Sequence, residues 1–104
     1  MINLIKSFMA SSAHMRAIRH WSMFDRADAL AQISKAVSLE TKECLLPKHL
    51  VFKGEIELAL GKKEEALKSF NCAKEIVERE PDYWKKPMNA DVLHRLDEGL
   101  RNNA

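Results

Sequence analysis

The sequence has few of the residues that mark turns, disulfide frameworks and membrane spans. Its 104 residues include three glycines, three prolines and two cysteines. Because β-sandwiches and barrels depend on many Gly- and Pro-rich turns, this scarcity argues against an all-β fold. Cys44 and Cys72 form no Cys-x-x-Cys motif, so no disulfide scaffold is indicated. No apolar run approaches the roughly 18–20 residues that a membrane-spanning helix needs.

Acidic residues are absent from the first 24 positions, although the whole chain carries a formal charge of only +2. Lys6, Arg16 and Arg19 give this segment a charge of +3, and the remaining residues carry −1. We interpret the segment as a helix with a basic solvent face. Contact with phosphate or an acidic partner is one alternative, and a targeting segment over the first 10–13 residues is another.

Apolar residues recur every three or four positions along most of the chain, which is the pattern of amphipathic helices. It predicts helices over 9–22, 26–39, 47–60, 62–80 and 88–101. Because very few residues join the first two helices, and the next two, each pair is expected to form an antiparallel hairpin. The sequence therefore predicts a single all-α domain over residues 1–104.

Single residues are expected to set the helix ends. Asp25 and Asn89 suit N-cap positions, and Pro47 suits a first helical turn. Gly61 suits the left-handed position after a helix, and Pro81 is expected to end the fourth helix. The segment 82–87 stays ambiguous between helix and loop, because Pro87 prevents a continuous ideal helix.

The two hairpins repeat each other at an offset of 37 positions. The corresponding pairs are Ala17 and Gly54, Phe24 and Gly61, Ala29 and Ala66, Ile33 and Phe70, Ala36 and Ala73, and Leu39 and Ile76. Small residues at such positions let helices approach closely, and a bulky residue one turn later fills the space between them.

This repeat resembles the tetratricopeptide repeat (TPR) family, whose unit is a helix–turn–helix of about 34 residues. The resemblance extends over residues 10–81 and rests on the spacing of Gly54, Gly61, Ala66, Phe70 and Ala73. It implies a short right-handed TPR-like solenoid of stacked antiparallel hairpins. Repeat 1 would cover 9–39, repeat 2 would cover 47–81, and 88–101 would form a C-terminal capping helix. Other αα-hairpin repeats stay open, because Leu50 and Glu57 occupy the family's Trp and Tyr positions.

The resemblance also implies a binding surface, the concave groove lined by the first helix of each hairpin. We define the predicted groove by the residues His14, Ile18, Trp21, Val51, Glu55 and Leu58. It lacks the Lys/Asn/Arg carboxylate clamp of some family members, so it fits a partner helix or an extended peptide. Core positions are the alternative for Trp21, Val51 and Leu58.

No pattern indicates catalysis, a cofactor or a metal. The sequence contains no nucleophile elbow, phosphate-binding loop, dinucleotide turn or zinc motif. We therefore expect no catalytic, cofactor-binding or metal-binding residues. One group of acidic and histidine residues shares a helical face, and we interpret it as a salt-bridging solvent surface; it comprises Asp91, His94, Asp97 and Glu98.

The two cysteines are expected to differ in exposure. Cys72 lies between apolar positions of a packed helix and is expected to be a buried, inert side chain. Cys44 lies in a connection and is the better candidate for oxidation. With no pairing indicated, a reducing compartment is the simpler expectation.

The function expected from these patterns is a non-enzymatic, cytoplasmic protein-interaction module. It would be a small adaptor, a chaperone-like subunit or a regulatory or neutralising accessory protein that binds a peptide or partner helix in the groove. One alternative is nucleic-acid binding through the basic first helix, with contacts from His14, Arg16, Arg19, His20 and Trp21. Another is a self-assembling subunit, such as a homodimer, in which a second copy fills the groove.

Overall fold

The computed structural model describes residues 2–103, and this range is all-helical, without strands. The five long helices are α1 (Ile2–Ser22), α2 (Arg26–Leu39), α3 (Leu46–Ala59), α4 (Lys63–Arg79) and α6 (Ala90–Asn103). Short helical turns connect them, namely η1 (Glu43–Leu45), α5 (Pro81–Trp84) and η2 (Pro87–Asn89). The prediction of an all-α fold is confirmed.

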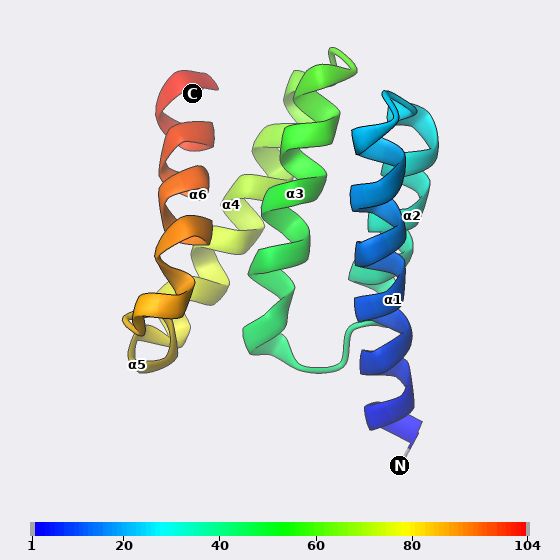
Figure 1. Ribbon diagram of the computed structural model, residues 1–104. Helices are drawn as coiled ribbons and strands as arrows, with labels where there is room; N and C mark the ends of the chain where they lie inside the picture. The colour runs from blue at the N-terminus through cyan, green and yellow to red at the C-terminus, as the bar shows by residue number, and fades with distance from the viewer. Residues whose placement is uncertain (1, 104) are drawn as a thin grey trace.

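The helices pack as two hairpins and one further helix. α1 packs against α2, α3 packs against α4, and α2 packs against α3 to join the hairpins. α6 then packs against both α3 and α4. In Figure 1, α2 and α4 lie behind α1 and α3, and the N-terminal end of α1 extends beyond the connection between α2 and α3.

The helix bounds agree with the sequence pattern at α2 and differ most at α1. The second helix begins and ends at the expected residues, 26 and 39. The first helix begins at Ile2 instead of residue 9. Its early turns are tied to the α2–α3 connection, where the hydroxyl of Thr41 donates to the carbonyl of Asn3 at 2.7 Å. The ambiguous segment 82–87 contains part of α5 and the start of η2.

Four of the five expected end signals act as predicted. Pro47 lies in the first turn of α3, and α4 ends at Arg79, shortly before Pro81. The side chain of Asp25 accepts a hydrogen bond from the amide of Asp28 and caps α2. Gly61 has a φ of 78° and ends α3 in the left-handed conformation. Asn89 does precede α6, but its side-chain amide donates to the carbonyl of Tyr83 at 2.7 Å. Asn89 therefore ties η2 to α5.

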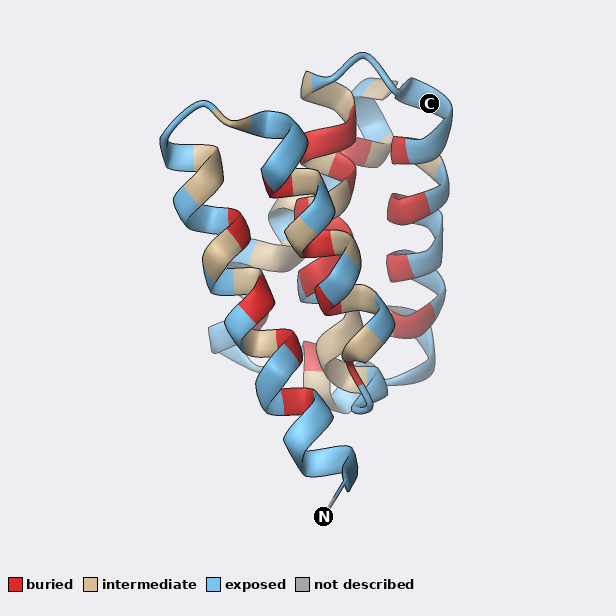
Figure 2. Ribbon diagram, turned by 90° about the vertical axis from the view of Figure 1, so that its right-hand side faces the viewer, coloured by how far each residue is buried: buried red, intermediate tan, exposed pale blue. Residues whose placement is uncertain are grey.

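Two clusters of buried side chains form the core, and they appear as red bands on the helices in Figure 2. The first cluster joins α1, α2 and α3 and contains Ala13, Ala17, Ala29, Ile33, Ala36, Phe52 and Ile56. The second joins α3, α4 and α6 and contains Leu50, Val51, Ala66, Phe70, Ala73, Ile76 and Leu96. α3 contributes to both clusters, so it connects the two halves of the core.

The cysteine expectation is wrong at Cys72. Its side chain is exposed, whereas Cys44 is half-buried. The helical period explains this result, because Phe70 and Ala73 point inward and Cys72, two residues after Phe70, lies on the opposite side of α4. Cys72 is therefore the more accessible thiol.

The 37-residue repeat is visible in the turns of the two hairpins. Phe24 and Gly61 are the two residues with positive φ in the described range, at 61° and 78°. The amide of Asp25 donates to the carbonyl of His20 at 2.9 Å, and the amide of Lys62 donates to that of Glu57 at 2.8 Å. Both turns therefore close in the same way, with a six-residue hydrogen bond around a left-handed residue.

The repeat is also visible between the helices of each hairpin. The guanidinium of Arg16 donates to the side chain of Gln32 at 3.0 Å, which joins α1 to α2. Lys53 lies 3.4 Å from the hydroxyl of Ser69 at the corresponding positions, which joins α3 to α4. The two hairpins thus share turns, small-residue contacts and the position of a polar bridge.

Phe70 is the tightest packing point of the second cluster. Its ring is fully buried and lies against Gly54 of α3 and Gly99 of α6. A Cβ atom built on either glycine would lie 2.6 Å from a ring carbon of Phe70. The absence of side chains at both positions therefore lets α3 and α6 approach the same ring from two sides.

Phe24→Gly is expected to stabilise the protein. Phe24 is 84% exposed, so little buried contact offsets its left-handed conformation. That conformation costs an L-residue roughly 1–2 kcal/mol. Allowing for the roughly 0.5–1 kcal/mol entropic cost of glycine, we expect the free energy of unfolding to rise by about 0.5–1 kcal/mol. Urea denaturation measures the free energy of unfolding. Gly61→Phe is the matched control and should destabilise; unchanged or lower stability in Phe24→Gly would contradict the expectation.

Gly54→Ala is expected to destabilise the protein by about 1–3 kcal/mol, because the added methyl group overlaps the buried ring of Phe70. Phe70→Leu in the same chain should recover part of that loss by shortening the side chain. A double-mutant cycle measured by urea denaturation gives the coupling between the two sites. If the effects of the two substitutions are additive, the ring of Phe70 does not determine how closely α3 and α4 approach each other.

Candidate functional site

The predicted groove is partly closed by the protein's own side chains. Val51 is fully buried in the second core cluster, so the expectation that it faces a partner is wrong. The reason is that α3 lies between α2, α4 and α6 and is covered on several sides. Leu58 is half-buried and packs against the same cluster.

Glu55 faces α6 and is paired with Arg95. The Arg95 Nε atom lies 3.0 and 3.2 Å from the two carboxylate oxygens of Glu55, and Arg95 also pairs with Asp91 at 3.2 Å. Hydrogen bonding to Glu55 raises the pKa of Arg95 above its usual value. This ion pair joins α3 to α6, so Glu55 is already occupied by an internal partner.

Trp21 and Ile18 remain partly accessible on α1. Trp21 is half-buried and packs against the first core cluster, with its ring edge-on to Phe52 at a centroid distance of 5.9 Å. Ile18 is 40% exposed. The contacts of Trp21 are therefore mainly those of a core side chain, which is the alternative to its role in the predicted groove.

His14 belongs to a buried polar network that joins three segments. Its Nδ1 atom lies 2.7 Å from Nδ1 of His49, and Nε2 of His49 lies 2.8 Å from Oε1 of Glu40. The hydroxyl of Ser7 donates to Oε2 of Glu40 at 2.6 Å. We call these four residues, Ser7, His14, Glu40 and His49, the Glu40 network.

Hydrogen bonds keep Glu40 ionised in this network. Burial alone would raise the pKa of Glu40, but hydrogen bonds from Ser7, His49 and the Lys42 amide outweigh burial and lower it. The Thr41 amide also donates to the same carboxylate at 3.1 Å. The side chains of Glu40 and His49 are both 0% exposed, so the charge is held entirely by internal donors.

Burial keeps both histidines neutral. It lowers the pKa of His14 to about 3, and unfavourable electrostatic interactions of a His14 cation with His49, Lys48 and Arg95 add to the effect. Burial also lowers the pKa of His49, against the opposing effect of Glu40. With His49 donating from Nε2 to the carboxylate, its Nδ1 accepts, and His14 donates from its own Nδ1.

The Glu40 network has the residue types of a catalytic triad in a different order. Nucleophilic catalysis requires the base to contact the hydroxyl and the acid to orient the base. Here the hydroxyl of Ser7 donates directly to Glu40, and His49 contacts the other carboxylate oxygen. In this order, the Ser7 hydroxyl is a hydrogen-bond donor to Glu40 and is not positioned as a nucleophile beside a base. The network therefore joins α1, the α2–α3 connection and α3.

The residues expected to contact nucleic acid have internal partners, with one exception. Arg16 donates to Gln32, and Nδ1 of His20 lies 3.5 Å from the Asp25 carboxylate. Arg19 is exposed. Trp21 is half-buried against the first core cluster, which leaves only part of its ring accessible for stacking on a base.

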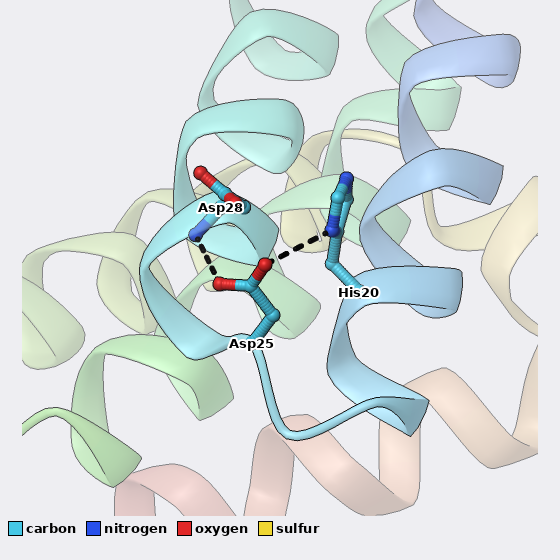
Figure 3. A group of neighbouring side chains, drawn as sticks. All are labelled: His20, Asp25 and Asp28. Atoms are coloured by element: carbon cyan, nitrogen blue, oxygen red, sulfur yellow. Dashed lines mark hydrogen bonds and ion pairs between the residues drawn. The ribbon is translucent and has the colours of Figure 1, made fainter.

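His20, Asp25 and Asp28 lie together at the turn between α1 and α2, with one potential metal-ligating atom of each within 4.8 Å of the others. Figure 3 shows the carboxylate of Asp25 between the other two residues, contacting the amide of Asp28 and the ring of His20. Both carboxylate oxygens of Asp25 therefore serve the helix cap and the histidine contact. We assign this group the role of closing the turn.

The acidic and histidine face of α6 forms ion pairs as expected. Asp91 pairs with Arg95, His94 pairs with Glu98 at 2.9 Å, and Asp97 pairs with Arg101. Each pair has the four-residue spacing of helix neighbours.

Large exposed apolar side chains gather on α1. Seven of them define what we call the α1 patch: Ile2, Leu4, Ile5, Phe8, Met9, Met15 and Ile18. Figure 2 shows the helix that ends at the N label largely in the colour of exposed residues. Between Ile2 and Met15 the only Lys, Arg, Asp or Glu is Lys6. One helix therefore exposes seven large apolar side chains.

Comparison with protein-family models, with curated proteins and with solved structures returns no match for this chain. Among residues 2–103, no helix combines the length and apolar character needed to cross a bilayer.

No spacing pattern in the sequence identifies the Glu40 network. His49 lies beside Leu50 and Val51 on an inward-facing part of α3, and Glu40 lies directly after α2. Polar residues at positions that the helical period places inside were the available signal. Nothing in their spacing showed that Ser7, His14 and Glu40 would meet His49.

The Glu40 network predicts loss of stability in acid. Above about pH 6.5, the histidines are neutral in both folded and unfolded chains. Below pH 6.5, His14 binds a proton in the unfolded chain but stays neutral in the folded chain until about pH 3. The lowered pKa values of His49 and Glu40 act in the same direction. The free energy of unfolding should therefore fall by up to about 1.4 kcal/mol per pH unit for each such group.

Urea denaturation between pH 7 and 4 measures this slope. His14→Phe should make the slope shallower, because it removes a group that must stay neutral on folding. Met15→Phe is the matched control, since it introduces the same residue at the neighbouring, exposed position and removes no titratable group, so the slope should stay unchanged. Equal slopes in wild type and His14→Phe would contradict the assignment.

Proposed function

We propose that this chain is a non-enzymatic protein-interaction module that binds another protein through the α1 patch. The observation that supports the proposal is the patch itself. Monomeric proteins rarely expose large contiguous apolar surfaces, and those that do use them for binding. Burying one large apolar side chain contributes about 1.5–3 kcal/mol, so a partner that covers the patch gains a substantial driving force.

The position of the α1 patch in the stack of helices also supports this function. A hairpin in a helical stack buries its faces against its neighbours, and the end units need a polar outer surface or a cap. α6 packs against α3 and α4 at one end. At the other end, the outward side chains of α1 stay exposed and apolar within residues 2–103. This surface is similar to the inner face of a stacked hairpin, which a further helix or a partner would cover.

We infer a TPR-like solenoid as the scaffold of this module. Support comes from the 37-residue correspondence of the turns, the polar bridges and the small residues between the hairpins. The packing of α2 against α3 stacks the second hairpin on the first. Such a scaffold holds one helix surface rigid for binding, as an adaptor or a regulatory accessory protein requires.

Among the hydrogen bonds of residues 2–103, none joins a Ser, Thr or Cys side chain to a histidine, which supports a non-enzymatic role. The Ser7 hydroxyl is committed to Glu40, and His49 is fully buried. Glu57 is also buried, and it accepts from Ser69 at 2.6 Å and from Lys53 at 3.0 Å. These polar groups satisfy one another in contacts between helices, so we assign them to stability.

Site-specific photocrosslinking tests the proposed function. A benzophenone amino acid replaces Phe8 in one variant and Met88 in another, because the two side chains are equally exposed, at 65% and 67%. In cells that express the chain, we expect one discrete protein adduct from position 8 and none from position 88. Adding Ile5→Glu to the position 8 variant should reduce the adduct at least tenfold, because it places a charge within the patch.

Gel analysis and mass spectrometry of the adducts provide the readout. Adducts of equal yield from both positions would contradict a specific surface on α1. Adducts at position 8 that contain only nucleic acid or lipid would contradict protein binding.

A further inference from the structure

Two hollows lie on either side of Phe8 on the surface of α1. The first has a volume of about 370 Å³ and lies between α1 and α2; its lining is Ile5, Phe8, Met9, Ser12, Arg16 and Lys35. The second has a volume of about 180 Å³ and lies between α1 and the α2–α3 connection; its lining is Leu4, Ser7, Phe8, Ser11, Lys42 and Leu45. Phe8 lines both hollows, so its exposed ring forms the ridge between them.

The charged residues at both hollows are basic. Arg16 and Lys35 border the first hollow, Lys42 borders the second, and no acidic residue lines either one. Among the ion pairs of residues 2–103, none involves these three side chains. Three cations without an acidic partner therefore surround an apolar centre. An occupant that brings carboxylates would complement them.

The charge pattern disfavours a second copy of this chain as the occupant. Two α1 helices packed on each other would bring together two segments that contain no Asp or Glu and carry +3 each. Like charges in direct contact are unfavourable at an interface. The outer face of α6 does offer acidic groups, but they are paired with Arg95, His94 and Arg101.

The shape of the surface favours a helix as the occupant. Side chains three and four residues apart on a helix lie about 5–6 Å from each other on one face. Such a row can straddle a ridge and fill the hollows on its two sides, which is how helices pack. A bilayer surface presents no ordered side chains that could fill the two hollows.

We propose that the two hollows beside Phe8 bind an acidic amphipathic helix of another protein. Its apolar side chains fill the hollows, and its Asp or Glu side chains pair with Arg16, Lys35 and Lys42. This inference rests on the proposed function and specifies the partner.

Selection from a displayed peptide library tests the inference. The library contains 16-residue helical peptides with apolar residues fixed at i, i+4, i+7 and i+11 and all other positions randomised. Selection on the full chain should enrich Asp and Glu at the positions that flank the apolar stripe. Enrichment of neutral or basic flanks, or of extended Pro-rich sequences, would overturn the inference.

A charge swap sharpens the test with the best selected peptide. The double variant Lys35→Glu/Lys42→Glu should bind it at least tenfold more weakly by fluorescence anisotropy, and a peptide with Lys in place of its acidic residues should recover binding to that variant. Lys68→Glu/Lys85→Glu is the control with the same change in net charge at two exposed lysines, and its affinity should stay within twofold. Circular dichroism verifies that each variant is folded.

Equal loss of affinity in the two double variants would overturn the charge assignment. Phe8-dependent sedimentation with vesicles of phosphatidylcholine and phosphatidylserine, without peptide binding, would make the occupant a membrane. Dimers in analytical ultracentrifugation that Phe8→Glu dissociates would make it a second copy.

The two proposals fail differently. If the photocrosslinker at position 8 attaches to a protein segment that is not an acidic helix, the proposed function stands and this inference fails. If position 8 captures no protein, the proposed function fails, whatever the peptides do.

Discussion

The buried carboxylate of Glu40 is the constraint on which the joint between the hairpins depends. It carries a negative charge at a site with no access to solvent, and such a charge is costly unless donors surround it. The donors come from α1, from α3 and from the backbone of the connection itself. Removing any one of them would leave part of a buried charge unsatisfied. The relative position of α1 and α3 is therefore fixed by electrostatics as well as by packing.

Close helix approach fixes the other half of the molecule. Phe70 of α4 fills the space that Gly54 and Gly99 leave open, so three helices meet at one ring. The corresponding place in the first hairpin holds Ile33 with Ala17. The smaller side chain needs no glycine beside it. This difference shows how one repeat pattern accommodates two core volumes.

The sequence predicted the helical class, the hairpin turns and most helix ends, because these depend on local signals. Asp25 and Gly61 act through neighbours within a few positions, which a reader of the sequence can see. Val51 was misplaced because the faces of α3 that become buried depend on α2, α4 and α6 together. The Glu40 network could not be found, since Ser7 and Glu40 are 33 positions apart and meet only after the hairpins have packed. The exposure of the α1 patch has the same origin, because periodicity marks a helix as apolar without showing which side stays uncovered.

The charged face of α6 has a consequence for how copies of this chain can assemble. A helical stack with complementary binding surfaces at its two ends would polymerise head to tail into filaments, because such contacts do not close on themselves. Among residues 2–103, seven of the eleven large exposed apolar side chains lie on α1, whereas the acidic side chains on the outer face of α6 each pair with a neighbour on the same helix. If the α1 patch binds a partner as proposed, the paired side chains of α6 offer no second apolar surface for another copy, so assembly would end after that first contact.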